Sequence, residues 1–232
     1  MLVYGKNVAK EMLENKKKIN SIILQEGFSD KSIISLIEKR KINVSYKSKK
    51  ELFGFEKYNH QGIILDVEDF KYANLDDFIH VDNSLVVILD HLEDPHNLGA
   101  IIRTCEAAGV SGIIIPKDRG VSVNATVMKT SVGAINNIPV VQVVNLSRTI
   151  DELKKEGFWI VGTDMNGDMD YKEVDYNGKI AIVIGNEGKG ISDLVKKSCD
   201  FVVRIPMYGN VNSLNASVSA GILIYEAIRY KK

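Results

Sequence analysis

The stretch that decides the fold of this chain is IPMYGNVNSLNAS, residues 205–217. An apolar run at residues 201–205 precedes it and is typical of a buried strand. After the polar loop, apolar and small residues return at helical spacing as far as residue 230. Asn212 or Ser213 would cap that helix, and the loop would then direct backbone N–H groups and short polar side chains into one pocket. A capped C-terminal helix without further function explains this stretch equally well.

Upstream of this loop, Val- and Ile-rich strands alternate with helical segments from residue 85 onward. Such continuous apolar strands, separated by helices, are typical of a parallel sheet that is covered on both faces. Ligands bind these sheets beyond the carboxyl ends of the strands. We expect strands at 85–89, 112–115, 140–144, 159–162, 180–184 and 201–205, and helices at 97–108, 124–135, 147–155, 191–197 and 213–230.

The beginning of the chain reads as a smaller α/β unit. We expect helices at 7–17, 30–40 and 48–53 and strands at 19–24, 42–46 and 63–67, with Asp30 capping the second helix. A charged, weakly patterned segment follows, with one helical turn expected at 76–79. The predicted domains are therefore residues 1–68 and 85–232, joined by a linker at 69–84.

Composition excludes several classes of protein. The 232 residues are 45% hydrophobic and 26% charged, which is ordinary for a soluble globular protein. No apolar run approaches the ~20 residues that span a bilayer, and the N-terminus lacks the layout of a signal peptide. Cys105 and Cys199 are far apart, which favours reduced cytoplasmic thiols over a disulfide or a zinc site. His91 and His96 lack metal-ligand spacing, so we expect no metal and no membrane partner.

The net charge of zero hides an asymmetry between the two parts of the chain. Residues 1–60 carry 13 Lys and Arg against 7 Asp and Glu, whereas the remaining residues carry 17 against 23. Such a basic segment is either a solvated face or a module that holds a polyanion for the rest of the chain.

Two further stretches follow predicted strands. In DHLEDPHNLGAIIRTCEAAG, residues 90–109, Asn97 lies in the first turn of a helix and Arg103 lies off its buried stripe, where it could be plain surface. In IGNEGKGIS, residues 184–192, three glycines let the backbone approach a ligand closely. The glycine spacing matches neither a Walker A loop nor a dinucleotide fingerprint, so nucleotide phosphate is not favoured.

Together these three stretches resemble the signature motifs of the SpoU-type RNA 2′-O-ribose methyltransferases, which belong to the knotted SPOUT superfamily. The start VYGKN, residues 3–7, and the triplet HQG, residues 60–62, resemble the substrate-binding domain of the bacterial subgroup that methylates a guanosine of 23S ribosomal RNA. The resemblance covers nearly the whole chain. It implies an α/β fold in which a trefoil-knotted parallel-sheet methyltransferase domain follows a small L30e-like RNA-binding domain, and it implies a homodimer.

The resemblance also implies a cofactor and a set of site residues. S-adenosylmethionine would be held mainly by backbone groups, without an acidic residue at a fixed offset for its ribose. The matching cofactor positions are Gly162, Thr163, Gly185, Ile205 and Leu214. The matching catalytic positions are Asn97, Arg103, Glu187, Ser213 and Asn215, and the RNA-binding candidates are Lys16, Lys17, Lys18 and His60.

The role of Arg103 has two interpretations. The family's proposed role is that of a base, but a guanidinium with a pKa above ~12 is a poor base near neutral pH. We therefore favour a clamp on a phosphate beside the target ribose, with Glu187 orienting Arg103 or Asn97. Asn186 stands where several relatives carry Ser, a difference that we expect to be harmless.

The leading hypothesis is a cytoplasmic, homodimeric enzyme that uses S-adenosylmethionine to methylate the 2′-oxygen of a guanosine in 23S ribosomal RNA. A transfer RNA substrate is the second reading, which the basic N-terminal domain disfavours because the family's transfer RNA enzymes usually lack it. A non-catalytic RNA-binding protein that retains the fold is the third. An oxidoreductase is the fourth, and the order of the glycines argues against it.

Overall fold

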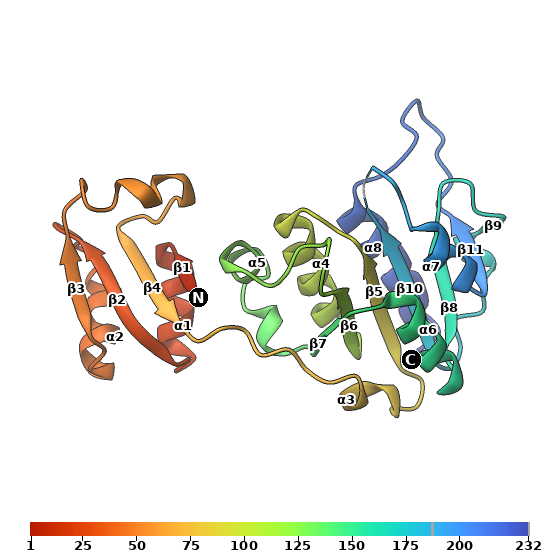
Figure 1. Cartoon of the computed structure of the whole chain (residues 1–232), viewed down its shortest axis with the longest axis horizontal. Helices are drawn as coiled ribbons and strands as arrows, with labels where there is room; N and C mark the ends of the chain where they lie inside the picture. Colours follow the sequence, from red (N-terminus) through yellow and green to blue (C-terminus); the bar gives the residue numbers. More distant parts are fainter. Residues whose placement is uncertain (187, 232) are drawn as a thin grey trace. The chain divides into compact units, whose positions relative to one another are not determined.

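The computed structural model describes residues 1–186 and 188–231, without the side chains of residues 56–58. The chain divides into two compact units (Figure 1). The first comprises residues 1–71 and 123–133, and the second comprises residues 72–122 and 134–232. Residues 123–133 thus belong to the first unit although they lie inside the range expected for the catalytic domain. The expected bounds 1–68 and 85–232 stay a prediction.

The first unit is a four-stranded sheet with helices packed on it. The strand order is β1-β4-β2-β3, in which β4 pairs antiparallel with β1 and β2, while β2 and β3 are parallel. Asp30 caps α2 as expected, since its carboxylate accepts from the backbone N–H of Ile33 at 3.3 Å. The bounds are β1 (Leu2–Tyr4), α1 (Lys6–Glu14), β2 (Ile19–Gln25), α2 (Lys31–Arg40), β3 (Val44–Lys47), the 3₁₀ helix η1 (Phe53–Tyr58), β4 (Ile63–Val67) and α5 (Ala125–Thr130).

Two helices of this unit differ from the prediction. The segment 48–53 is a turn followed by η1, and within it the carboxylate of Glu51 accepts from the N–H and the hydroxyl of Ser48. The helix expected at 124–135 ends at Thr130, since Val132 and Gly133 have left-handed backbone with φ of 48° and 84°. Met128 of α5 packs against the core of the first unit.

The second unit contains a seven-stranded sheet whose paired strands are all parallel, in the order β7-β6-β5-β10-β8-β11-β9. The central strands are buried along their whole length, which explains their continuous apolar sequences. Its elements are α3 (Asp76–Ile79), β5 (Leu85–Asp90), α4 (Pro95–Ala108), β6 (Gly112–Pro116), η2 (Ala134–Asn136), β7 (Val140–Val143), α6 (Leu146–Lys155), β8 (Trp159–Thr163), β9 (Met169–Asp170), η3 (Tyr171–Glu173), β10 (Ile180–Gly185), α7 (Asp193–Ser198), β11 (Phe201–Arg204) and α8 (Ala216–Ile228).

In the last part of this unit, the order of the strands in the sheet differs from their order in the chain. Strand β10 inserts between β5 and β8, and β11 then adds on the far side of β8. From there the chain returns across β10, so that α8 packs against both β10 and α4 (Figure 1). This return differs from the simple side-by-side order of most parallel sheets. The trefoil knot itself stays a prediction.

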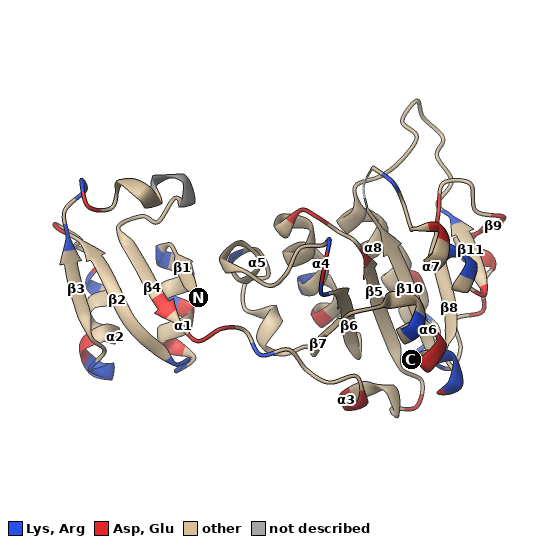
Figure 2. Ribbon diagram, in the orientation of Figure 1, with Lys and Arg blue, Asp and Glu red and all other residues tan. Residues whose placement is uncertain are grey.

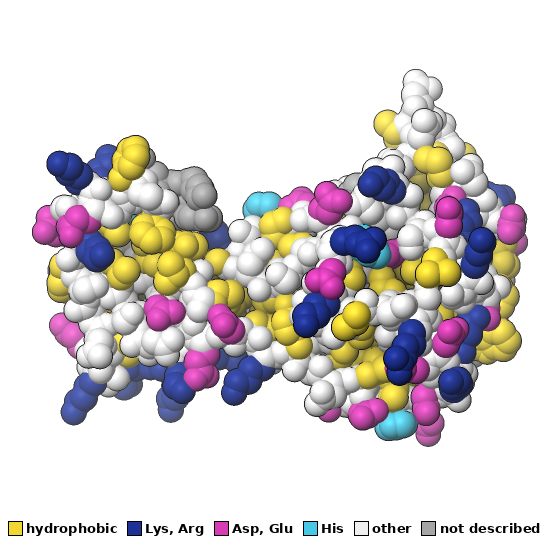
Figure 3. Space-filling view, viewed as in Figure 1, with side chains coloured by type: hydrophobic (Ala, Val, Ile, Leu, Met, Phe, Trp, Pro, Cys, Tyr) yellow, Lys and Arg dark blue, Asp and Glu magenta, His cyan; other side chains and the backbone are white. Residues whose placement is uncertain are grey.

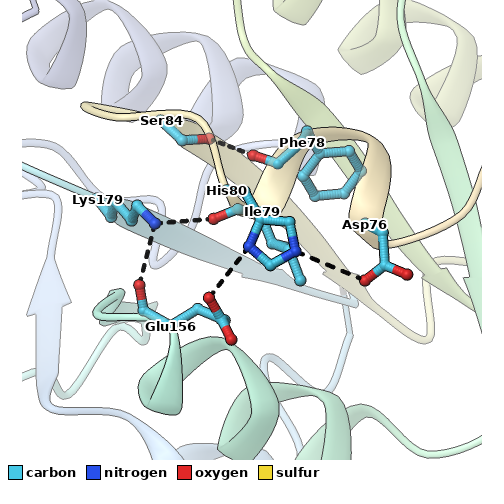
Figure 4. A network of polar contacts seen from close by, with 7 residues as sticks. All are labelled: Asp76, Phe78, Ile79, His80, Ser84, Glu156 and Lys179. Atoms are coloured by element: carbon cyan, nitrogen blue, oxygen red, sulfur yellow. Dashed lines mark hydrogen bonds and ion pairs between the residues drawn. The ribbon is translucent and has the colours of Figure 1, made fainter.

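The segment 72–84 is packed into the second unit at the beginning of its strands (Figure 4). The ammonium group of Lys179 donates to the carbonyl oxygens of Ile79 at 2.9 Å and Glu156 at 3.2 Å. The imidazole of His80 lies 3.3 Å from the Glu156 carboxylate. Phe78 is buried beside Gly112, where a Cβ atom would come within 2.4 Å of its ring. The helical turn expected at 76–79 is present as α3.

Candidate active site

A pocket of about 320 Å³ lies beyond the carboxyl ends of β8, β10 and β11. Its volume is within the range of small-molecule sites. The chain between β11 and α8 forms one wall and projects beyond the sheet (Figure 1). The lining residues are Thr163, Asp164, Met165, Asn166, Ile184, Gly185, Asn186, Gly188, Lys189, Gly190, Val203, Ile205, Met207, Asn212, Ser213, Leu214, Ala216 and Ser219.

The glycine-rich loop after β10 is a tight backbone turn. The backbones of Asn186 and Gly190 pair with each other, at 3.0 and 2.8 Å. A Cβ atom on Gly185 would lie 2.1 Å from the carbonyl carbon of Gly190, so only glycine allows this close approach. This turn, in which the backbones of Gly185 and Gly190 are in close contact, lines one edge of the pocket, and we call it the cradle.

Asn186 holds this loop in place with its side chain. Its Oδ1 accepts from the backbone N–H of Gly188 at 2.9 Å and of Lys189 at 3.3 Å, while its Nδ2 donates to the carbonyl of His91 at 3.1 Å. The residue that we expected to be a harmless variation thus links the glycine loop to the loop between β5 and α4. Asn186 forms these bonds through two separate atoms, Oδ1 and Nδ2, whereas a serine would have to form all of them through a single oxygen atom on a shorter side chain.

Replacing Asn186 by Ala should weaken the pocket without removing a group that reacts. Loss of three hydrogen bonds predicts a stability decrease of about 1–3 kcal/mol and weaker binding of S-adenosylhomocysteine, measured by calorimetry. Asn177→Ala is the matched control, because Asn177 is an exposed turn residue outside the pocket. Equal effects of the two variants on affinity would refute this role of Asn186.

A buried carboxylate strengthens the same link. Asp90 is 1% exposed at the end of β5, directly opposite Gly185 in the register of the sheet. One carboxylate oxygen accepts from the backbone N–H of Ser192 at 2.6 Å, and the other bonds to Nδ1 of His91. The ends of β5 and β10 are therefore joined on both sides of the glycine loop.

Asn97 and Asn215 join the first and third motifs. Nδ2 of Asn215 donates to Oδ1 of Asn97 at 3.0 Å, and Asn97 is buried in the first turn of α4. Oδ1 of Asn215 accepts from the N–H of Ser217 at 2.9 Å and caps α8. The predicted caps, Asn212 and Ser213, are wrong, because those residues line the pocket instead. The side chain that caps α8 thus also fixes it to α4.

Arg103 is exposed on α4. Within residues 1–186 and 188–231, no hydrogen bond or ion pair to its guanidinium is found. The next residue, Thr104, lies beside α8: a Cβ atom on Gly221 of that helix would be 4.0 Å from Cγ2 of Thr104. Glu187, another of the five predicted catalytic residues, lies outside the described residues. Ser213, also a catalytic candidate, lines the pocket.

Four of the five predicted cofactor positions line the pocket, namely Thr163, Gly185, Ile205 and Leu214. Gly162 does not line it. A Cβ atom on Gly162 would lie 2.6 Å from Sγ of Cys199, so this glycine allows α7 to pack on β8. Sequence reasoning missed Asp164 and Lys189, although a polar residue directly after a buried parallel strand is a recognisable signal. Their roles in binding stay predictions.

The RNA-binding candidates lie in the first unit. Lys16, Lys17 and Lys18 form the turn between α1 and β2, and Lys18 pairs with Glu68. Arg40, at the end of α2, donates to the carbonyl of Lys17 at 2.6 Å, so two basic segments lie side by side (Figure 2). Nδ1 of His60 accepts from the N–H of Gly62 at 3.0 Å and shapes the turn before β4.

The basic residues of the turn between α1 and β2 lie beside those at the end of α2, and we call the two sets together the basic turn. It comprises Lys16, Lys17, Lys18, Lys39, Arg40 and Lys41. Sequence reasoning named only its first three members, because the contact of Arg40 with the turn joins residues that are far apart in the chain. Dark-blue side chains gather along one edge of the first unit in Figure 3. Among the described residues no cluster of metal-binding side chains is found, and none of their helices is long and apolar enough to cross a membrane.

Comparison with known proteins extends these observations. Residues 84–225 match the SpoU rRNA Methylase family, and residues 2–73 match the family described as RNA 2′-O ribose methyltransferase substrate binding. A Staphylococcus epidermidis protein, assigned by name to the TrmH family of tRNA/rRNA methyltransferases, is 44% identical over 237 residues, which cover 99% of this chain and 95% of that protein.

Two solved structures have the same architecture. The SpoU methyltransferase AviRb from Streptomyces viridochromogenes, in complex with S-adenosylmethionine, has a TM-score of 0.79 at 27% identity and covers 99% of this chain and 89% of its own. An rRNA methyltransferase from Sinorhizobium meliloti, also with S-adenosylmethionine bound, has a TM-score of 0.76 at 26% identity, with coverage of 99% and 87%.

The fold, the main-chain cradle and these matches define an S-adenosylmethionine-dependent RNA methyltransferase. The chain belongs to the SpoU family of RNA 2′-O-ribose methyltransferases, also called the TrmH family. The family and the cofactor inferred from the sequence motifs are therefore confirmed. The pocket fits this cofactor, since its volume of about 320 Å³ suits a small molecule and four of the five expected cofactor positions line it.

Proposed function

We propose that this enzyme methylates the 2′-oxygen of a guanosine in 23S ribosomal RNA, in the cytoplasm and as a homodimer. One observation carries the proposal: an exposed arginine, Arg103, stands on the helix whose first turn is fixed, through Asn97 and Asn215, to the wall of the cofactor pocket. Such a site can bring together a cofactor and a phosphate-bearing substrate.

The reaction requires mainly positioning. When bound, S-adenosylmethionine supplies a methyl group that its sulfonium has already activated. Arg103 would bind a phosphate beside the target ribose as a bidentate donor and hold the 2′-hydroxyl in line. A guanidinium group remains protonated near neutral pH, so it is unsuitable as the proton acceptor. The hydrogen bond between Asn97 and Asn215 would hold Arg103 at a fixed position relative to the loop that contains Ser213.

Ribosomal RNA is favoured over transfer RNA by the first unit. It matches a family of RNA substrate-binding domains and carries the basic turn, and phosphate binding by such groups supplies most of the sequence-independent affinity for RNA. The Sinorhizobium rRNA methyltransferase covers this unit as well as the second. Two alternatives to this function remain: an enzyme that methylates transfer RNA, and a non-catalytic RNA-binding protein that retains the fold.

A homodimer is supported by the outer face of α8. Val218 is 49% and Tyr225 54% exposed, and both lie on one side of the helix because seven residues span two turns. The residues of the other side, Ala220 and Leu223, are buried against the second unit. The first side thus offers an apolar surface to a second copy.

The direct test offers labelled S-adenosylmethionine with unmodified large-subunit ribosomal RNA and, separately, with unmodified transfer RNA. We expect the label in a 2′-O-methylguanosine of the ribosomal RNA. Label in transfer RNA alone would keep the chemistry and reject the proposed substrate. Tight RNA binding without label in either RNA would indicate the non-catalytic binder.

Neutralising the basic turn should reduce the salt dependence of RNA binding. Lys16→Ala with Lys17→Ala should lower the slope of log K against log[salt] by about 0.7–0.9 for each lysine that contacts a phosphate. Lys18→Ala should change it less, because Lys18 is already paired with Glu68. Lys49→Ala is the control, as an exposed lysine elsewhere in the same unit. A slope that stays at the wild-type value would assign the turn to a solvated face.

A further inference from the structure

Asp164 is the one carboxylate among the described residues that line the pocket. It directly follows β8, and its backbone N–H donates to the carbonyl of Val203 at 3.0 Å, which fixes the residue to β11. Its Oδ1 accepts from the N–H of Asn166 at 2.8 Å, and its Oδ2 accepts from Nζ of Lys196 at 2.9 Å. The side chain is only 16% exposed, so these contacts hold it in one position.

The carboxylate of Asp164 is ionised but already paired. Burial opposes its ionisation, yet the hydrogen bonds from Lys196 and from the backbone of Asn166 outweigh burial and hold its pKa below the ordinary value. Each carboxylate oxygen has about two lone pairs, and one on each is occupied. The group therefore keeps free acceptor positions while Lys196 neutralises its charge.

This combination selects the kind of ligand group that Asp164 can bind. An ammonium group would be attracted by Asp164 and repelled by Lys196, so the pair offers it little net attraction. A neutral hydroxyl group experiences no such repulsion and gains a hydrogen bond to an ionised acceptor. Gly190 also lines the pocket and has no side chain that could cover Oδ2 of Asp164. A Cβ atom on Gly190 would lie 4.0 Å from that oxygen.

We propose that Asp164 accepts hydrogen bonds from the ribose hydroxyls of the adenosine part of S-adenosylmethionine and thereby selects a ribonucleoside cofactor. A carboxylate at a parallel strand end performs the same task in dinucleotide-binding folds. The sequence reasoning expected no acidic residue in this role. The proposal rests on the assignment of the pocket to S-adenosylmethionine and is independent of which RNA is methylated.

The test measures binding in the absence of RNA, using the full-length chain and isothermal titration calorimetry. The ligands are S-adenosylhomocysteine and its 2′-deoxy and 3′-deoxy analogues, and the proteins are wild type, Asp164→Ala and Asp164→Asn. Asp168→Asn is the matched control, because Asp168 is an exposed carboxylate in the same loop outside the pocket. Thermal melting identifies any variant that fails to fold, and Asp164→Asn retains the shape of the side chain.

For S-adenosylhomocysteine, Asp164→Ala should bind about tenfold more weakly or worse, as expected for a hydrogen bond to a charged acceptor. The wild-type protein should bind at least one deoxy analogue more weakly than S-adenosylhomocysteine, by a similar factor. Asp164→Ala should bind that analogue and S-adenosylhomocysteine with equal affinity. Equal losses for the deoxy analogues in wild type and variant would overturn the proposal. Failure of wild type to bind S-adenosylhomocysteine would instead reject the assignment of the pocket.

Discussion

Arg103→Ala should remove nearly all methyl transfer while leaving cofactor affinity unchanged. Loss of one donor that acts on the reacting group or on the phosphate beside it predicts a decrease in kcat of about 10²–10³-fold. Cofactor binding should persist, because Arg103 does not line the pocket and its charge interacts with no described residue. Single-turnover methylation of ribosomal RNA and calorimetry with S-adenosylhomocysteine measure the two quantities separately.

Arg148→Ala is the control for this experiment. Arg148 is an exposed arginine of α6 that pairs with Glu152 at 3.2 Å, on the same unit and away from the pocket. A second variant, Arg103→Lys, distinguishes a positive charge from a bidentate donor, and we expect it to recover only part of the rate. Near-wild-type turnover of Arg103→Ala would remove this residue from the mechanism.

Gly185→Ala, in contrast to Arg103→Ala, should lower the affinity for the cofactor. The added Cβ atom would lie 2.1 Å from the backbone of Gly190 and 2.3 Å from that of Ile191, so the glycine loop must move. Overpacking of this kind costs about 1–3 kcal/mol, and displacement of the cradle should weaken S-adenosylhomocysteine binding by about 100-fold, or about 2.8 kcal/mol. Calorimetry and thermal unfolding report these two changes.

Gly54→Ala is the matched substitution, since no atom lies within 4 Å of the added group and the backbone of Gly54 is not left-handed. It should change neither stability nor cofactor binding. If Gly185→Ala binds S-adenosylhomocysteine as wild type does, the loop between Gly185 and Gly190 is not the cofactor cradle.

Local sequence signals predicted those parts of the fold that neighbouring residues determine. The apolar runs located the main strands of the second unit, and the spacing around Ile101 and Cys105 located α4. Helix α4 begins at Pro95, two residues before the predicted start, because proline is favoured at the first position of a helix. The motif loops also indicated the wall of the pocket.

Residues that are brought together by distant contacts could not be predicted in this way. Met128 joins α5 to the first unit, although its own segment lies between strands of the second. Asn215 rather than Asn212 or Ser213 caps α8, because its amide also reaches Asn97. Asp164 is paired with Lys196, which lies 32 residues later in the chain. Each of these features requires the three-dimensional arrangement.

The return of α8 across β10 to α4 has a consequence for biosynthesis. All residues that line the pocket lie between 163 and 219, and its last wall is completed by the start of α8. A ribosome that has synthesised only the first 200 residues therefore carries a chain that contains the whole first unit and Arg103 but no complete cofactor site. Nascent chains can acquire the capacity to hold RNA before they acquire the capacity to modify it.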